Sequence, residues 1–303
     1  MVKISVVINT LNEERNLPCL LASIKDFSDD VVIIDMNSDD NTQKIAEEFG
    51  ARVFTHKRTG YVEPARNFAI IKAKNEWILI LDADEVLTST LSKKLLQIAK
   101  NPSADYYRLP RKNIIFGTWI KHSKWWPDYN IRFFKKGKVS WSEVIHSVPM
   151  TQGRGADLPA KEDYAILHYN YATVDDYLLR MNRYTTIQSQ VLIDSGYKFI
   201  WKDLISKPAT EFIGRYLAGE GYKDGVHGLS LAFLQAFSEL VLYLKIWQSE
   251  KFLPQSVTFS EAKRELEHQK KELEWWMYET EIKNQGPLAS LSTKVIRKVF
   301  LKR

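Results

Sequence analysis

Residues 76–85 read Glu-Trp-Ile-Leu-Ile-Leu-Asp-Ala-Asp-Glu, so a run of large apolar side chains leads directly into a cluster of acids. An apolar run of this length predicts a strand that is buried on both faces of a sheet. Asp82 and Asp84 then stand at the end of that strand with a single residue between them. Two such carboxylates can hold a hard divalent cation, Mg²⁺ or Mn²⁺. The alternative is a plain turn, or the cap of a helix that begins after Thr88.

The chain before this strand alternates between two hydrophobic periods. Strands are expected at residues 4–8, 31–34 and 52–55, and helices at 13–25, 42–50 and 64–73. This alternation predicts a parallel sheet that is covered by helices. Ligands of open α/β sheets bind beyond the carboxyl ends of the strands. The polar clusters at 10–13, 35–40 and 82–85 follow three of the strands, so we expect them to meet in one site.

The composition is that of an ordinary folded protein of 303 residues, with 45% hydrophobic and 26% charged residues and one cysteine. These values exclude a disordered chain, a collagen-like repeat and a disulfide scaffold. The lone Cys19 fits a reducing compartment, and the N-terminal apolar run is too short for a signal peptide. We therefore expect a cytoplasmic protein. Gln235, Glu239 and Lys245 interrupt the longest apolar stretch, 229–247, which argues against a transmembrane helix.

The character of the chain changes twice after residue 105. Residues 106–148 are rich in aromatic and basic side chains and predict further strands, whereas the pattern is helical from Thr173 onward. Thr173 and Asp176 have the spacing of a capping box variant, which predicts the start of a helix. We expect two domains, an α/β domain at 1–200 and a helical region at 201–303.

The last segment, 288–303, is basic and amphipathic and contains no acidic residue. Its two faces carry Leu288, Leu291, Val295 and Val299 on one side and Lys294, Arg297 and Lys298 on the other. With a formal net charge of +6 for the whole chain, this pattern indicates peripheral association with the inner face of an anionic membrane. Ordinary packing of the helix against the catalytic domain is the alternative.

Four segments, in order along the chain, resemble the inverting glycosyltransferases of family 2, which have the GT-A fold. They are VVINTLNEE at 6–14, VIIDMNSDDNT at 32–42, PARN at 64–67 and the Asp-x-Asp (DXD) motif at 82–84. The resemblance implies a Rossmann-like, mostly parallel sheet flanked by helices, with a helical C-terminal extension. Asn9 and Leu11 depart from the proline and tyrosine that are common in the first segment, so an aromatic contact to the nucleotide base is missing.

The resemblance also implies a binding site for a nucleotide-diphosphate sugar, with a UDP-sugar as the first candidate. Its residues would be Thr10 and Glu13 near the nucleoside, Asn12 in the same segment, Asp35 at the base, Arg66 near the base or diphosphate, and Asp82 near the ribose. Glu13 has an alternative interpretation as an acid that the helix dipole favours in a first turn. Arg66 has one as a surface residue, although its position just inside a helix start favours phosphate contact.

A metal site follows from the same resemblance, with Asp84 as a ligand of Mg²⁺ or Mn²⁺. His168 follows an apolar run and resembles a downstream histidine that helps to bind the metal in many GT-A enzymes. A neutral imidazole is a credible ligand beside carboxylates. The alternative is a buried histidine with a structural role only.

The inverting reaction needs a base that takes the proton of the acceptor hydroxyl. Residues 126–129 and 132–134 resemble a subgroup similar to lipopolysaccharide-core glycosyltransferases, in which a His-Glu pair often stands at the matching place. This chain has His146 followed by serine there. Glu143 is therefore our first candidate for the base, and Asp128 and His146 are the alternatives.

Together these features predict an inverting, metal-dependent glycosyltransferase. It would move a sugar from a nucleotide-diphosphate sugar to a hydroxyl of a cell-envelope glycan, such as lipopolysaccharide, or of a lipid-linked acceptor. A nucleotidyltransferase of sugar phosphates usually carries a glycine-rich basic loop after the first strand, and residues 10–13 lack one. A non-enzymatic basic module for membrane or RNA leaves the paired carboxylates without a purpose. The sequence has no nucleic-acid-binding motif of the usual kinds, so we expect no nucleic-acid partner.

Overall fold

The alternating segments of the first part of the chain form a seven-stranded sheet in the computed structural model, which describes residues 3–58, 63–141 and 149–300. In spatial order its strands are β12 (Gly155–Asp157), β6 (Tyr106–Leu109), β9 (Asn130–Lys135), β4 (Trp77–Asp82), β1 (Ile4–Thr10), β2 (Asp30–Asp35) and β3 (Arg52–Thr55). Strands β4, β1, β2 and β3 run parallel, and β9 runs antiparallel between β4 and β6. The predicted α/β class with a mostly parallel sheet is confirmed.

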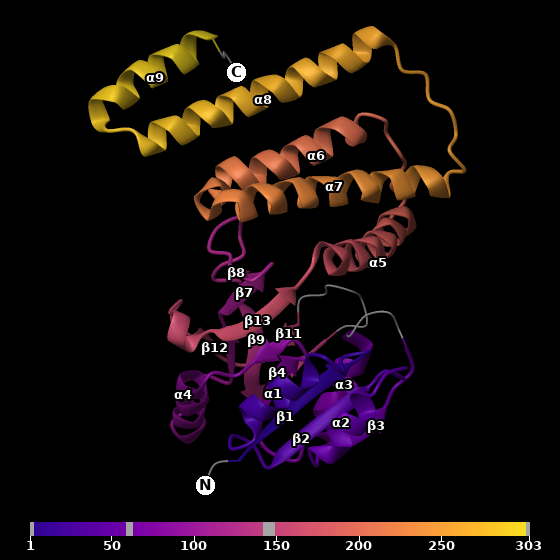
Figure 1. Ribbon diagram of the computed structural model, residues 1–303, viewed down its shortest axis with the longest axis vertical. Helices are drawn as coiled ribbons and strands as arrows, with labels where there is room; N and C mark the ends of the chain where they lie inside the picture. The colour runs from indigo at the N-terminus through magenta and orange to yellow at the C-terminus, as the bar shows by residue number, and fades with distance from the viewer. Residues whose placement is uncertain (1–2, 59–62, 142–148, 301–303) are drawn as a thin grey trace. The chain divides into compact units, whose positions relative to one another are not determined.

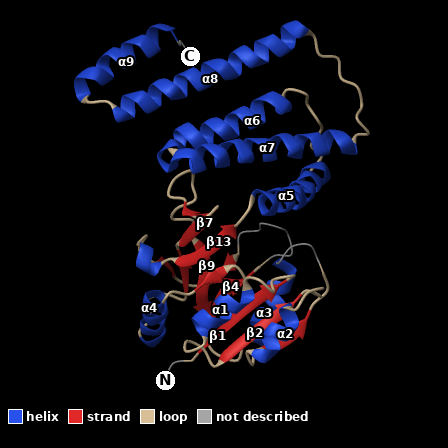
Figure 2. Cartoon of the chain, viewed as in Figure 1, coloured by secondary structure: helices blue, strands red, loops and turns tan. Residues whose placement is uncertain are grey.

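Helices cover both faces of this sheet (Figure 2). They are α1 (Leu17–Ile24), α2 (Thr42–Glu48) and α4 (Ser89–Lys100) over one face and α3 (Glu63–Lys72) over the other. Successive strand residues point to opposite faces, so Val6 and Ile8 join the first core while Val7 joins the second. Burial on both sides explains why the strands read as continuous apolar runs.

The register of the parallel strands places the polar residues at one edge. Thr10 at the end of β1 lies opposite Asp35 at the end of β2, and Asn9 lies opposite Asp82 at the end of β4. The expectation that the clusters following these strands share one edge is therefore confirmed.

Helix α1 begins later than the periodicity predicts, at Leu17 rather than near residue 13. The backbone N–H groups of Asn12, Glu13 and Glu14 donate hydrogen bonds to side chains that follow β2. Asn12 also has a φ of 59°, in the left-handed region that asparagine tolerates better than most residues. The segment after β1 is thus tied to its neighbouring loop.

A second, smaller sheet extends the first unit and carries the predicted histidine. Its strands in this unit are β5 (Glu85–Val86), β13 (Ile166–Tyr171) and β7 (Arg111–Ile115). A separate two-stranded sheet is formed by β10 (Val139–Ser140) and β11 (Met150–Thr151). The turn η1 (Glu162–Tyr164) precedes β13. Strands β5 and β13 pair antiparallel, with His168 opposite Glu85. This pairing brings His168 next to the acidic cluster at the end of β4.

The chain divides into two units, one made of residues 1–115 and 126–170 and the other of residues 116–125 and 171–303. The second contains the short strand β8 (Thr118–Trp119), the helices α5 (Val174–Asp194), α6 (Asp203–Ile213), α7 (Gly225–Ser249), α8 (Phe259–Asn284) and α9 (Pro287–Phe300), and the turns η2 (Gly214–Ala218) and η3 (Gly221–Asp224) (Figure 1). The predicted capping box is present, because the Thr173 and Asp176 side chains each bind the other's backbone N–H.

The sequence predicts a boundary at residue 200, whereas in the structure residues 171–200 group with the C-terminal helices. Hydrogen bonds between α5 and α7 account for this grouping. Gln235 Nε2 donates to the Tyr177 hydroxyl at 2.8 Å, and Lys245 Nζ donates to Asn182 Oδ1 at 2.8 Å. These partners are about 60 residues apart in sequence, so the pattern within α5 alone does not reveal them.

We expect Trp77→Ala to lower the free energy of unfolding by about 3–5 kcal/mol, because a large buried aromatic is lost. Trp77 is 2% exposed, and its ring stacks on Phe133 with centroids 4.6 Å apart. Urea unfolding followed by circular dichroism measures the change. Ile71→Ala, at a side chain that is 69% exposed, is the matched control and should change stability by less than about 0.5 kcal/mol. Equal effects of the two substitutions would contradict the packing described here.

Candidate functional site

Asp35 organises the loop between β2 and α2. Its carboxylate accepts hydrogen bonds from the Thr10 hydroxyl at 3.1 Å and from the Ser38 backbone N–H and hydroxyl at 2.9 and 2.6 Å. Asp35 is 2% exposed. Buried carboxylates need such partners. Thr10 and Asp35, both predicted site residues, therefore hold together the ends of β1 and β2 and the loop that follows β2.

Asn12 and Glu13 join the segment after β1 to the same loop. Asn12 Oδ1 accepts from the Asp39 backbone N–H at 2.8 Å, and the Asn12 N–H donates to Ser38 Oγ at 2.9 Å. Glu13 Oε2 accepts from the Asn16 side chain at 2.8 Å. Both predicted residues lie beside the carboxyl ends of the parallel strands, where the donor site is expected.

The two carboxylates of the Asp-x-Asp motif point to different partners, and Asp82 lies between two arginines. Arg66 Nη2 approaches Asp82 Oδ1 at 3.1 Å, and Arg132 Nη2 donates to Asp82 Oδ2. Burial by itself would raise the pKa of Asp82, but the charges of Arg132 and Arg66 outweigh it and hold this pKa far below its usual range. Asp82 is therefore a fixed negative charge at the end of β4.

Arg132 is the central cation of this cluster and is 2% exposed. Its guanidinium also binds Glu85 Oε1 at 2.8 Å, and Glu85 Oε2 accepts from the Asp82 backbone N–H at 2.8 Å. Burial would lower the pKa of Arg132, but Asp82 and Glu85 raise it above its usual value. Arg66 completes the arrangement, with its guanidinium 5.4 Å from the centre of the Trp141 ring.

Asp84 faces the predicted histidine. Asp84 Oδ1 lies 3.4 Å from His168 Nε2, and the two residues are 9% and 6% exposed. A carboxylate oxygen and an imidazole nitrogen at this separation could both contact one divalent ion. Among the residues that the structure describes, no three His, Cys, Asp or Glu side chains gather to hold an ion by themselves. The protein would therefore supply two ligands, and a bound ion would take the others from substrate and water.

A chain of hydrogen bonds sets the orientation of His168. Asn113 Nδ2 donates to Asp128 Oδ2 at 3.0 Å, so its Oδ1 faces His168 Nδ1 at 2.6 Å. An amide oxygen only accepts, so Nδ1 donates to it and Nε2 is the ring nitrogen that faces Asp84. Partners of this kind commonly orient metal-ligating histidines. Arg111 holds Asp128 in turn, at 2.8 Å.

The structure thus brings together Asp82, Asp84, Arg66 and His168, whereas the predicted base Glu143 and its alternative His146 lie outside the described residues. Sequence reasoning missed the parts played by Arg132, Glu85 and Asn113. Arg132 did carry a signal, because it is a charged residue directly before two phenylalanines in an apolar strand. Charges in such positions are almost always paired.

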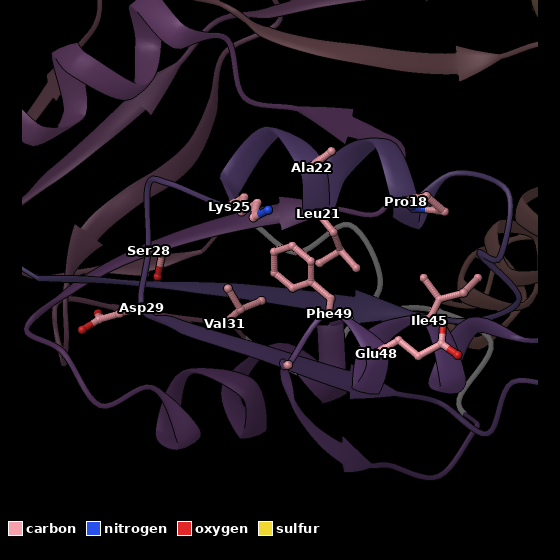
Figure 3. A pocket seen from close by; sticks show the side chains of 11 residues that line it. Pro18, Leu21, Ala22, Lys25, Ser28, Asp29, Val31, Ile45, Glu48 and Phe49 are labelled. Carbon is pink, nitrogen blue, oxygen red and sulfur yellow. The ribbon is translucent and has the colours of Figure 1, made fainter.

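A hollow of about 680 Å³ between α1 and α2 lies apart from these residues (Figure 3). Leu21, Ile45 and Phe49 line it, together with Ser28, Asp29 and Val31 around the start of β2. It therefore extends towards the amino end of β2, and none of the predicted site residues lines it. In open sheets the carboxyl end is the usual place for a substrate, so we assign the site to the Asp82–Asp84 region.

Comparison with known proteins identifies the family of this chain. The family model described as Glycosyl transferase family 2 matches residues 5–152. A glycosyltransferase of Rickettsia bellii is 30% identical over 205 residues, which cover 65% of this chain and 69% of the relative. The chain belongs to glycosyltransferase family 2.

Other known proteins match over most of the chain. The lipopolysaccharide core biosynthesis glycosyltransferase LpsC of Rhizobium meliloti is 23% identical over 253 residues, covering 81% of this chain and 92% of LpsC. A solved structure of S. aureus TarS 1-349 with UDP-GlcNAc covers 80% of this chain and 92% of that one, at 15% identity and a TM-score of 0.46. Similarity this low does not transfer site residues, which rest here on the geometry of the chain itself.

We expect Asp82→Asn to lower the free energy of unfolding at neutral pH by about 2–3 kcal/mol, because Arg132 stays buried with Glu85 as its remaining acid. The pKa of Asp82 is lower in the folded state, so its stabilising effect is complete above the unfolded pKa of about 3.9. The effect shrinks as the pH falls below that value towards the folded pKa. Urea unfolding of both proteins at neutral and acidic pH tests this convergence.

Asp157→Asn is the matched control for this substitution. Asp157 also pairs with an arginine, Arg108, but their side chains are 40% and 51% exposed. Exposed pairs contribute little, so its loss should cost less than about 1 kcal/mol at any pH. If Asp82→Asn behaved like this control, the pairing of Asp82 with the buried Arg132 would not stabilise the fold.

Proposed function

We propose that this family 2 glycosyltransferase moves a sugar, with inversion, from a nucleotide-diphosphate donor to a hydroxyl of a cell-envelope glycan or lipid-linked acceptor. A UDP-sugar is the first candidate for the donor. The observation that carries the proposal is the pairing of Asp84 with His168 at the carboxyl edge of the parallel strands. The name of LpsC supports an envelope glycan as acceptor, and the exposed, single Cys19 is compatible with a cytoplasmic location.

Within this proposal, Asp84 and His168 hold Mg²⁺ or Mn²⁺. When bound, the ion supplies positive charge that stabilises the diphosphate as it leaves the sugar. The nitrogen ligand favours Mn²⁺, because Mg²⁺ prefers oxygen ligands alone. Arg66 adds a second positive charge next to Asp82. Neither Asp84 nor His168 needs to move a proton when the bond between the sugar and the diphosphate breaks.

The acceptor hydroxyl must still lose its proton, and Glu143 is the proposed base. Asp128 is less suited to this task, because Arg111 and Asn113 both donate to its Oδ2. Both donors occupy Oδ2, so this oxygen holds Arg111 and Asn113 rather than facing an acceptor hydroxyl. We therefore assign Asp128 to the positioning of Asn113 and His168.

Metal-stimulated release of nucleotide diphosphate tests the donor site. Purified protein is incubated with a panel of nucleotide sugars and Mn²⁺ or Mg²⁺, and one donor should be hydrolysed slowly without an acceptor. Asp84→Asn should lower this release by about a hundredfold and weaken Mn²⁺ binding measured by electron paramagnetic resonance. Asp29→Asn, at an exposed acid paired with Lys3, is the control that should leave both unchanged.

Two outcomes would contradict this assignment. Release that continues at the same rate in the presence of a chelator would show that the reaction does not need the metal. Pyrophosphate in place of nucleotide diphosphate would favour a nucleotidyltransferase.

Glu143→Gln tests the base. Loss of a general base typically costs a factor of about 10²–10⁴, so sugar transfer should fall by that amount while donor binding and Mn²⁺ affinity stay unchanged. Transfer rates with an acceptor glycan and a donor titration separate the two effects. Asp128→Asn is the comparison, and we expect it to weaken Mn²⁺ binding through His168. If it abolished transfer and left Mn²⁺ affinity intact, Asp128 would be the base instead.

A further inference from the structure

Helix α9 packs with its polar face inward and its apolar face outward. Ser290 and Thr293 are each 7% exposed, and the Thr293 hydroxyl donates to Gln285 Oε1 at 2.8 Å. On the other side of the helix, Leu291 and Val295 are 58% and 62% exposed. Soluble amphipathic helices bury the opposite face.

The contacts of α9 with α8 explain this orientation. Arg297 pairs with Glu279 of α8, and its guanidinium lies 5.2 Å from the centre of the Trp275 ring. Arg297 shares the face of Ser290 and Thr293, since positions three and four apart lie on one side of a helix. The contacts that hold α9 in place therefore turn its apolar side away from the protein.

Helix α7 also has an exposed apolar side, although its buried residues, such as Leu231 and Ile246, are mostly apolar as well. The polar side chains that interrupt its apolar sequence point inward. Gln235 and Lys245 bind α5, and burial raises the pKa of Glu239. The exposed side is apolar, with Val226 at 71% and Phe233 at 58% exposed. These two residues are seven apart, or about two turns, so they share one face.

Length and composition add a further property of this helix. Gly221–Ser249 is long and apolar enough to cross a membrane, a test that core helices of soluble proteins also pass. A core helix would be mostly buried, whereas only 28% of its most apolar window is buried in the structure. Its polar residues bind neighbouring helices on one side, so α7 offers one apolar face rather than an apolar circumference.

We propose that the apolar faces of α7 and α9 dock on the surface of an anionic membrane, with α9 lying in the plane of the interface. The charges beside the apolar face of α9 favour a membrane over a second copy of the chain as the partner of this face. Lys294 and Lys298 lie exposed beside the apolar face of α9, and the described helix 287–300 contains no acid. Apolar residues flanked by lysines suit anionic lipid, whereas two copies of this face would oppose like charges. The inference rests on the helical unit alone and not on the proposed reaction.

Vesicle sedimentation of the full-length protein tests this proposal without any donor. The protein should bind vesicles of phosphatidylcholine mixed with phosphatidylglycerol more strongly than phosphatidylcholine alone. L291Q/V295Q should weaken binding to both kinds of vesicle by at least about tenfold, because apolar contact area is lost. K294Q/K298Q should weaken binding to the anionic vesicles only, by roughly fivefold for each lysine. V226Q/F233Q tests the face of α7 in the same way.

Ile71→Gln is the matched control, because it changes an equally exposed apolar residue of the first unit and should leave vesicle binding unchanged. Circular dichroism of each variant checks that the helices are retained. The proposal is overturned if the protein does not sediment with anionic vesicles, or if L291Q/V295Q binds them like the unmodified chain. It is also overturned if sedimentation velocity shows an oligomer that L291Q/V295Q dissociates, since the face would then belong to a second copy.

Discussion

A buried guanidinium holds the site together. Arg132 is 2% exposed and binds Asp82 and Glu85, which stand on either side of the turn that carries Asp84. Moving a cation of this kind out of water costs several kcal/mol unless acids surround it. The requirement for paired charges therefore constrains where β9 lies against β4 and how the turn leaves the sheet. Asp82 is committed to the arginines as a result, and Asp84 is left to face His168.

Much of the fold could be predicted because the first hundred residues carry a local signal. Apolar runs and helical periods define the parallel strands, and the carboxyl ends of those strands identify the edge that holds the site. Local patterns did not show the Asp82–Arg132 pair, since 50 residues separate its members. They also placed the start of α1 too early, near residue 13, whereas residues 12–14 are bound by side chains that follow β2 and the helix begins at Leu17.

The helical unit shows a different limit of sequence reasoning. Its amphipathic faces are visible in the sequence, but which face turns inward depends on the partner helix. Trp275 and Glu279 of α8 recruit the polar side of α9, and no periodicity within α9 reports that choice. The same holds for α7, where α5 supplies the partners of Gln235 and Lys245. In α9 the polar side faces the protein and the apolar side faces outward, an arrangement that suits a lipid surface better than water.

The Asn113 side chain connects two parts of the site, Asp128 and His168. Its amide has a donating end on Asp128 and an accepting end on His168. Turning the amide over would put like dipoles against both neighbours, so the loop that carries Asp128 and the imidazole share one permitted setting. The segment before β9 and the ring beside Asp84 are therefore joined through the two ends of one planar group.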